Sequence, residues 1–288
     1  MNIKQILEYG IEVLKENNID EAILKARIIL SNILKQNKEY LMIHDLEEVD
    51  EKLIEVFKQD ISKLCENIPI QYITNKQEFM GLEFYVDKRV LIPQPDTEIL
   101  VEEVIDIVEK NEKVKILDLC TGSGAIGISI VKNIENCEIT LSDISCDALN
   151  VVTQNYNNIV GANCVRPRNN NIKIIQSDLF EKIQDKFDII VSNPPYIKSD
   201  VIKTLDKEVQ NEPLLALDGG KDGLDIYRRI IEQAYKYLNK DGYLCLEIGY
   251  DQKEEVIRLI EETTKYKDIY SKKDLAGNDR IVVCKKEN

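Results

Sequence analysis

The first 66 residues have apolar positions spaced as on amphipathic helices. Each of three stripes repeats every three or four residues, as expected for helices that pack against one another. The stripes are Ile3, Ile6, Leu7, Ile11 and Leu14; Ala22, Ile23, Ala26, Ile29, Leu30 and Ile33; and Leu53, Ile54, Phe57, Ile61 and Leu64. Asn17-Asn18 marks the first break, and Asp20 is predicted to cap the second helix. We therefore predict a small helical bundle with these stripes as its core.

Residues 77–92 change to a strand-like pattern around Gly81. Runs of apolar and aromatic residues predict strands, and the glycine predicts the turn of a hairpin. The predicted strands are 78–80, 82–86 and 90–92. Two prolines end this segment, and Asp96 or Thr97 is predicted to cap a helix that runs to about Lys110.

From residue 114 onward, short apolar runs alternate with helical patterns. The predicted strands are Val114–Leu119, Glu138–Ser142, Ile172–Gln176, Phe187–Ser192 and Tyr243–Ile248. The predicted helices are near 124–134, 145–159, 223–238 and 251–263. This alternation predicts an α/β fold with a parallel sheet and crossover helices. Two last strands, near 266–271 and 280–285, flank a short loop with Gly277-Asn278. They predict an antiparallel hairpin at the sheet edge, which most dinucleotide-binding sheets lack.

Composition narrows the class of protein. The chain has 288 residues, of which 43% are hydrophobic and 31% charged, as is typical of a soluble globular protein with more than one domain. Charged residues interrupt every apolar stretch, so neither a signal peptide nor a membrane helix is expected, and we expect a cytoplasmic protein. Residues 1–110 carry 13 basic and 23 acidic residues, a net charge of −10 out of −14. Such a surface repels a phosphate backbone and disfavours an enzyme of duplex nucleic acid.

The cysteines and the histidine exclude familiar metal sites. The number of cysteines is odd and none has C-x-x-C spacing, which predicts buried reduced thiols. They are Cys65, Cys120, Cys137, Cys146, Cys164, Cys245 and Cys284. A single histidine, His44, cannot supply the several imidazoles of a typical catalytic zinc site and is expected on a helix surface. We expect no metal.

A glycine-rich segment follows the predicted strand Val114–Leu119. Gly122-x-Gly124-x-x-Gly127 removes Cβ atoms that would keep a ligand from the backbone, and the next helix offers unpaired N–H groups. Asp143 lies 21 residues after Gly122, at the end of the next strand, where it can bind ribose hydroxyls. The pattern indicates an adenosine-type cofactor and leaves a nicotinamide and an S-adenosyl cofactor both open.

Asn193-Pro194-Pro195-Tyr196 follows the predicted strand Phe187–Ser192 and decides between these cofactors. An amide or exocyclic amine is a poor nucleophile because its lone pair is delocalised. The Asn193 side-chain oxygen and the Pro194 carbonyl can each accept one NH2 hydrogen, which directs the lone pair at an electrophilic methyl group. The prolines restrict the backbone, and Tyr196 offers a flat face to a planar acceptor. The segment favours methyl transfer from S-adenosylmethionine to a planar NH2 group, without a general base.

A third candidate is Ser177-Asp178-Leu179-Phe180, at the end of the third sheet strand. Asp178 can meet the adenine amino group, while Leu179 or Phe180 covers the face of the adenine ring. A helix cap followed by a core aromatic side chain explains the same residues nearly as well.

At these residues the chain resembles the release factor glutamine methyltransferase (PrmC/HemK) family, almost from end to end. Adenine N6 enzymes share the methyltransferase motifs, whereas segments 91–98 and 216–224 are much more specific to this family. The segments that carry the resemblance are Pro69-Ile70-Gln71-Tyr72-Ile73, Leu91-Ile92-Pro93-Gln94-Pro95-Asp96-Thr97-Glu98, the glycine-rich turn, the Asn-Pro-Pro-Tyr segment, Ala216-Leu217-Asp218-Gly219-Gly220-Lys221-Asp222-Gly223-Leu224, Leu246-Glu247-Ile248-Gly249 and Asp274-Leu275-Ala276-Gly277-Asn278-Asp279-Arg280.

The resemblance implies a fold, a division of the chain and a reaction. The fold is a Rossmann-like class I methyltransferase sheet with an antiparallel edge hairpin and a small N-terminal helical domain. The divisions are a helical substrate-recognition domain at 1–76, a β-hairpin connector at 77–95 and an S-adenosylmethionine-dependent methyltransferase domain at 96–288. The expected reaction methylates the side-chain amide nitrogen (N5) of the glutamine in the Gly-Gly-Gln motif of class I peptide chain release factors, with S-adenosylhomocysteine as product. We expect a monomer that binds neither nucleic acid nor a membrane.

The site residues follow from the motifs and the resemblance together. The predicted cofactor residues are Cys120, Thr121, Gly122, Ser123, Gly124, Asp143, Asp178, Leu179 and Asn193. The predicted acceptor residues are Asn193, Pro194, Pro195 and Tyr196, of which Asn193, Pro194 and Tyr196 are assigned to catalysis. The chain departs from the family pattern at two positions. Gln94 replaces the expected arginine, which removes any ion pair there, and Leu179 replaces a tryptophan of some members, which weakens the case for adenine stacking.

Three alternatives stay open at this point. A ribosomal-protein glutamine methyltransferase shares the Asn-Pro-Pro-Tyr chemistry. An adenine N6 methyltransferase would need base flipping and a region that reads its target, for which the acidic N-terminal part is poorly suited. A non-catalytic interaction module is disfavoured because both motifs are complete, and failure to bind S-adenosylmethionine would revive it.

Overall fold

The contacts of the computed structural model divide the chain into two units. The described residues are 1–108, 113–161 and 171–287, so Cys164, Lys110 and nearly all of the polar segment 166–171 lie outside them. The first unit comprises Met1–Lys76 and Asp206–Asn211, and the second comprises Gln77–Leu205 and Glu212–Asn288. No helix in the described ranges is both long enough and apolar enough to cross a membrane.

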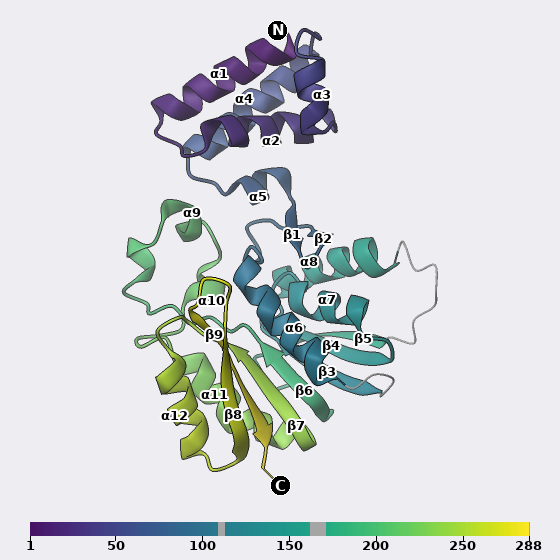
Figure 1. Ribbon diagram of the computed structural model, residues 1–288, viewed down its shortest axis with the longest axis vertical. Helices are drawn as coiled ribbons and strands as arrows, with labels where there is room; N and C mark the ends of the chain where they lie inside the picture. The colour runs from purple at the N-terminus through teal and green to yellow at the C-terminus, as the bar shows by residue number, and fades with distance from the viewer. Residues whose placement is uncertain (109–112, 162–170, 288) are drawn as a thin grey trace. The chain divides into compact units, whose positions relative to one another are not determined.

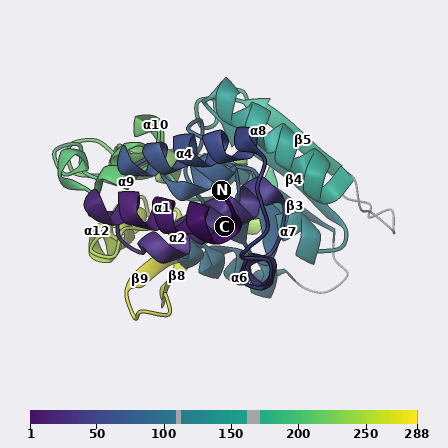
Figure 2. The same ribbon diagram turned by 90° about the horizontal axis from the view of Figure 1, so that it is seen from above.

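The first unit is a helical bundle whose core is formed by the predicted apolar stripes. Its helices are α1 (Ile3–Glu16), α2 (Ala22–Leu34), α3 (Lys38–Ile43), α4 (Glu51–Cys65), α5 (Ile70–Thr74) and α9 (Lys207–Gln210). Helices α1, α2 and α4 lie side by side (Figures 1 and 2). Phe57 is fully buried among them and lies against Gly10 of α1, where a Cβ atom would lie 2.6 Å from the ring. Glycine therefore permits the close contact of α1 with α4.

The boundaries of these helices agree only in part with the sequence. Asn17 ends α1 and Asn18 has a φ of 56°, so the predicted break is confirmed. The predicted cap by Asp20 is wrong, because α2 is preceded by Glu21, which has a left-handed φ of 55° and no side-chain capping bond. A left-handed turn of the backbone takes the place of the cap. His44 is exposed at the end of α3, as expected.

The second unit holds a sheet that, in the described residues, has seven strands in the order β5-β4-β3-β6-β7-β9-β8. The strands are β3 (Val114–Leu119), β4 (Cys137–Asp143), β5 (Asn171–Gln176), β6 (Phe187–Ser192), β7 (Leu238–Glu247), β8 (Tyr266–Lys273) and β9 (Asp279–Lys286). Strands β3 to β7 pair in parallel, while β9 is antiparallel to both β7 and β8. The predicted parallel sheet with an antiparallel edge hairpin is confirmed, and β9 is inserted between β7 and β8.

Helices cover both faces of this sheet (Figure 1). The helices are α6 (Glu98–Ile107), α7 (Ala125–Asn133), α8 (Cys146–Tyr156), α10 (Leu214–Leu217), α11 (Asp225–Tyr237) and α12 (Lys253–Glu262), with short turns η1 (Pro95–Thr97), η2 (Asn157–Gly161) and η3 (Ile202–Thr204). Alternate residues of β3 point to opposite sides, so that Ile116 packs in the core beneath α6 and α7, and Leu117 in the core beneath α11 and α12. The sheet therefore has two buried faces, as a parallel sheet requires.

The hairpin before the sheet differs from its prediction. β1 (Gln77–Phe79) and β2 (Leu82–Phe84) pair around Met80 and Gly81, as expected, and Phe79 and Phe84 are buried in the core of the second unit. The third predicted strand, 90–92, is wrong, because this segment forms no strand.

The predicted cap of the next helix is confirmed in position only. Thr97 is the N-cap residue of α6, but its side chain makes no capping hydrogen bond, because its hydroxyl accepts from Asn193. Asp96 pairs with Arg280 instead. The helix ends at Ile107, three residues before the predicted limit.

The order of the strands places one edge of the sheet at a topological switch point. The chain passes from β3 through β4 to β5 on one side, and then returns to β6 on the other side of β3. The register pairs Leu119 with Ser142 of β4 and with Ser192 of β6, so the three strands end at the same level. Open α/β sheets bind their ligands at such a point, beyond the carboxyl ends of the strands.

Phe57→Ala should destabilise the first unit strongly. The ring is fully buried, and truncation of a core phenylalanine costs about 3–5 kcal/mol in the free energy of unfolding. Val56, its neighbour on α4, is 41% exposed, so Val56→Ala should change that free energy by less than about 1 kcal/mol. Urea unfolding followed by circular dichroism measures both variants, and equal losses would contradict this account of the core.

Candidate active site

The glycine-rich turn after β3 is held in shape by a buried carboxylate. Asp118 is fully buried, and its Oδ2 accepts from the Thr121 hydroxyl at 2.6 Å and from the Gly127 N–H at 3.0 Å. Burial raises the pKa of Asp118 to about 7, although these two hydrogen bonds lower it. A Cβ atom on Gly127 would lie 2.1 Å from the Leu141 side chain, so only glycine lets α7 begin this close to the sheet. Asp118 thus fixes the turn from beneath.

The backbone of the glycine-rich turn has several positive φ angles. Cys120, Gly122 and Gly124 have φ angles of 58°, 55° and 82°. A Cβ atom on Gly122 would meet nothing within 4 Å, which leaves its backbone open to a ligand. The Cys120 thiol is neutral at ordinary pH, because burial raises its pKa to about 12.

Asp143, the last residue of β4, faces this turn. Its Oδ2 accepts from the Gly122 N–H and its Oδ1 from the Ser145 N–H, both at 2.9 Å. Burial raises the pKa of Asp143, and the backbone N–H groups oppose that shift. A carboxylate oxygen has two lone pairs, so each oxygen can accept one further hydrogen bond. The backbone therefore orients Asp143 and leaves acceptor capacity for a pair of hydroxyl groups.

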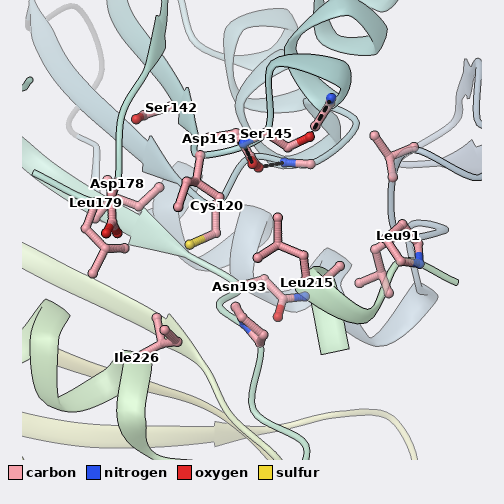
Figure 3. Close-up of a pocket in the computed structure, with 18 of the residues that line it drawn as sticks. Leu91, Cys120, Ser142, Asp143, Ser145, Asp178, Leu179, Asn193, Leu215 and Ile226 are labelled. Atoms are coloured by element: carbon pink, nitrogen blue, oxygen red, sulfur yellow. Dashed lines mark hydrogen bonds between the residues drawn. The ribbon is translucent and has the colours of Figure 1, made fainter. Parts of the chain in front are cut away.

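A cavity of about 230 Å³ lies at the carboxyl ends of β3, β4 and β6. Figure 3 shows Cys120 between Asp143 and Asn193, with Asp178 and Leu179 on one side and Leu91 and Leu215 on the other. The lining residues are Arg89, Val90, Leu91, Leu119, Cys120, Gly122, Ser142, Asp143, Ile144, Ser145, Ala148, Ser177, Asp178, Leu179, Asn193, Pro195, Pro213, Leu215, Ala216, Ile226 and Arg229.

The cavity brings together most of the residues singled out in the sequence. Of the predicted cofactor residues, Cys120, Gly122, Asp143, Asp178, Leu179 and Asn193 line it. Thr121, Ser123 and Gly124 do not, because the two side chains are buried within the turn and Gly124 begins α7. Of the predicted acceptor residues, Asn193 and Pro195 line the cavity, whereas Pro194 and Tyr196 do not. Pro194 is buried, and the Tyr196 hydroxyl donates to Glu247.

Asp178 is held by a partner that the sequence did not reveal. Arg229 of α11 donates to its Oδ1 at 2.8 Å, and both side chains line the cavity. The partners lie 51 residues apart, and no motif joins them. Leu179 and Ile226 add apolar surface, whereas Phe180 is buried in the core, stacked on Tyr237 at 4.7 Å. Phe180 therefore does not cover a ligand in this cavity.

Asn193 follows β6 directly, and its amide has a defined orientation. Its Nδ2 donates to the Thr97 hydroxyl at 3.3 Å. Because the nitrogen is turned toward Thr97, the side-chain oxygen is the atom left to accept a hydrogen bond in the cavity. Thr97 is almost fully buried and comes from the segment between the hairpin and α6.

The end of α10 and the residues after it hold the loop 193–196 through backbone hydrogen bonds. Ile197 donates to the Leu217 carbonyl at 2.9 Å, and Gly219 donates back to the Ile197 carbonyl at 2.8 Å. A Cβ atom on Gly219 would lie 2.7 Å from the Tyr196 backbone, so this approach needs glycine. The segment 216–224 thus fixes the loop in place.

Gln252, a buried residue before α12, holds the same loop from another side. Its Nε2 donates to the Tyr196 carbonyl at 3.0 Å, and its Oε1 accepts from the Gly249 N–H at 3.0 Å. Gln252 was not among the residues predicted from the sequence, although it lies only three residues after the segment 246–249.

Tyr196 and the two departures from the family pattern complete the site. The Tyr196 hydroxyl donates to Glu247 Oε1 at 3.4 Å, and burial raises the tyrosine pKa far above its ordinary value. Gln94 is exposed and donates to the Ile92 carbonyl at 3.0 Å, while Leu179 is buried with a φ of 46°.

Within the described ranges, no group of three or more histidine, cysteine, aspartate and glutamate side chains could hold a metal ion.

Comparisons with known proteins identify the fold of the chain. A family model described as methyltransferase small domain matches residues 95–207, and one described as PrmC N-terminal domain matches residues 5–74. A solved structure of a methyltransferase from Pyrococcus furiosus has a TM-score of 0.50 at 20% identity and covers 72% of this chain and 90% of its own. The predicted class I methyltransferase fold with its N-terminal helical part is therefore confirmed.

Two relatives match nearly the whole chain. A release factor glutamine methyltransferase from Clostridium acetobutylicum is 43% identical over 288 residues, which cover 99% of this chain and 98% of the relative. A second, from Clostridium botulinum, is 41% identical and covers 99% of this chain and 100% of its own length. Because these relatives are 43% and 41% identical over 99% of the chain, the chain belongs to the release factor glutamine methyltransferase family.

Proposed function

We propose that this enzyme transfers the methyl group of S-adenosylmethionine to the side-chain amide nitrogen (N5) of a glutamine in the Gly-Gly-Gln motif of class I peptide chain release factors. The observation that carries the proposal is that Asp143 and Asn193 line one cavity on either side of Cys120. In this proposal Asp143 binds the ribose of the cofactor and Asn193 orients the amide of the acceptor. Names of relatives at 43% and 41% identity support the release factor as substrate.

The residues around the cavity fit S-adenosylmethionine. Asp143 would accept from the two ribose hydroxyls, and the open backbone at Gly122 admits the ligand. Asp178, oriented by Arg229, would accept from the adenine amino group, with Leu179 and Ile226 as apolar cover. The cofactor supplies an electrophilic methyl group on a sulfonium centre.

The residues after β6 would act on the glutamine amide. Asn193 Oδ1 and the Pro194 carbonyl each accept one hydrogen of the NH2 group, which aligns the nitrogen lone pair with the methyl group. These acceptors also stabilise the positive charge that develops on nitrogen. After transfer the nitrogen is strongly acidic, and its proton leaves to water or to a carbonyl oxygen. No residue with a matched pKa is needed for this step.

We further propose that the first unit recognises the release factor. Its surface carries an excess of acidic residues, and large apolar side chains are exposed on it: Met42, Ile43 and Leu46 are 68%, 76% and 73% exposed. Exposed apolar side chains within a polar surface are typical of interaction sites.

Labelled S-adenosylmethionine with purified candidate acceptors tests the reaction itself. We expect label on the Gly-Gly-Gln glutamine of a class I release factor, located by mass mapping. Label on a ribosomal protein, or on adenine in DNA with no reaction on release factors, would retain the methyl transfer and reject the assigned substrate.

Asp143→Ala should weaken the binding of S-adenosylmethionine about tenfold to a hundredfold, because two hydroxyls lose a charged acceptor. Asp147→Ala removes an exposed carboxylate four residues away and should leave the affinity near that of the wild type. Calorimetry measures both dissociation constants, and an unchanged value for Asp143→Ala would remove this residue from the site.

Asn193→Ala should reduce the single-turnover rate of methyl transfer by about 10²–10³-fold, because one of two oriented acceptors is lost. Cofactor affinity is measured separately, since Asn193 also lines the cofactor cavity. The same substitution at exposed Asn150 of α8 serves as control. Methylation by Asn193→Ala at the wild-type rate would refute the mechanism.

Ile43→Ser with Leu46→Ser should raise the KM for intact release factor roughly tenfold and leave cofactor affinity and kcat unchanged, because apolar contact with the partner is lost. Val56→Ser, also at an exposed position of the first unit, is the control. An unchanged KM in the double variant would place the recognition surface elsewhere.

A further inference from the structure

Thr97 is the residue through which the segment 91–98 contacts Asn193. Its hydroxyl oxygen accepts from Asn193 Nδ2 at 3.3 Å, and Asn193 lines the cavity (Figure 3). Thr97 is buried, and it makes no capping hydrogen bond although it occupies the N-cap position of α6. A threonine at an N-cap ordinarily accepts from the backbone of its own helix. The hydroxyl group is therefore committed to Asn193 and not to the helix.

Both neighbours of Thr97 in the chain carry carboxylates that bind elements outside this segment. Asp96 Oδ2 lies 3.1 Å from Nη2 of Arg280, near the start of β9. Glu98 Oε1 accepts from the Met80 N–H at 2.6 Å, in the turn between β1 and β2. The residues before and after Thr97 are thus tied to two different hairpins.

Arg280 is itself held firmly, so it gives Asp96 a defined position. Its side chain is 11% exposed, and its Nη2 also lies 2.9 Å from Oδ2 of the buried Asp274. Asp274 Oδ1 accepts from the Asn278 N–H at 2.9 Å, within the turn between β8 and β9. The Arg280 carbonyl accepts from the Ile248 N–H at 2.8 Å, just beyond β7. A planar guanidinium group bound by two carboxylates keeps one direction.

We propose that Asp96 and Glu98 are positioning residues for methyl transfer, because they fix the place of the Thr97 hydroxyl group that accepts from Asn193. This inference rests on the proposed function, since it assigns Asn193 Oδ1 to the NH2 group of the acceptor. One hydrogen bond to a loosely held threonine would let the amide shift. With both neighbours of Thr97 tied, the amide stays aligned, and a displacement of about 1 Å can cost about 10²-fold in rate.

The test uses the full chain with the variants Asp96→Ala and Glu98→Ala. Each removes one tie, and each should lower the single-turnover rate about tenfold, with the dissociation constant of S-adenosylmethionine changed less than about threefold. Glu98→Gln keeps an oxygen that can accept from the Met80 N–H, so it should recover most of the lost rate. Asp279→Ala is the control, because Asp279 pairs with Lys253 at 3.2 Å and not with the segment 91–98. It should keep the wild-type rate.

Double variants separate positioning from a merely structural effect. Thr97→Val keeps the shape of the side chain but removes the hydroxyl group, and it should lower the rate about tenfold or more. If Asp96 and Glu98 act through that hydroxyl group, Asp96→Ala or Glu98→Ala should lower the rate of Thr97→Val by less than about twofold further. Fully additive losses in the double variants, or the wild-type rate in Thr97→Val or in both alanine variants, would overturn the inference.

Thermal unfolding checks that each variant folds. If Glu98→Ala does not, Asp96→Ala decides, because Asp96 is exposed and its loss leaves no cavity. All rates are measured on the acceptor that the wild-type protein methylates. Failure of the wild type to methylate release factors, with methyl transfer to another NH2 group, would therefore reject the proposed substrate and still let the variants decide the inference. Absence of methyl transfer to every acceptor would reject both.

Discussion

The site depends on the hydrogen-bond register of three parallel strands. Leu119, Ser142 and Ser192 are paired across β3, β4 and β6, so the residues that follow them emerge at one level. Backbone ladders fix this alignment with a precision that loops alone cannot give, and a slip of one residue would turn every side chain of a strand to the other face. Cys120, Asp143 and Asn193 are therefore neighbours because of pairing, although they are far apart in the sequence.

Carboxyl groups buried around this edge hold its loops in position. Asp118 binds the glycine-rich turn from below, and Glu212 accepts from the Ile92 N–H at 2.9 Å next to the cavity wall. Burial raises the pKa of each to about 7, because desolvation disfavours the charged form of a carboxyl group. Rigid placement of a few atoms is achieved at the expense of stability, as is usual at catalytic sites.

Hydrophobic periodicity and short motifs predicted the strands, the main helices and the glycine-rich and Asn-Pro-Pro-Tyr segments, because each of these features depends on a few consecutive residues. β3 and β6 have the predicted bounds. The Thr97 side chain makes no capping hydrogen bond to its own helix, because its hydroxyl accepts from Asn193, 96 residues away. Arg229 and Gln252 were missed for the same reason: contacts between distant residues leave no periodic pattern, and neither residue type marks a site by itself.

The assignment of Asp206–Asn211 to the first unit has an evolutionary consequence. Glu208 of this segment pairs with Lys25 at 2.7 Å, and Asn211 donates to the Asn67 carbonyl at 2.9 Å. The chain leaves the loop 193–196, contributes to the helical bundle, and returns to supply Leu215 to the cavity. The bundle is thus completed by residues encoded within the catalytic half of the gene. Recombination that exchanged only the first 76 codons would replace Lys25 but keep Glu208, so this ion pair would form only if the incoming bundle also had a cation at that position.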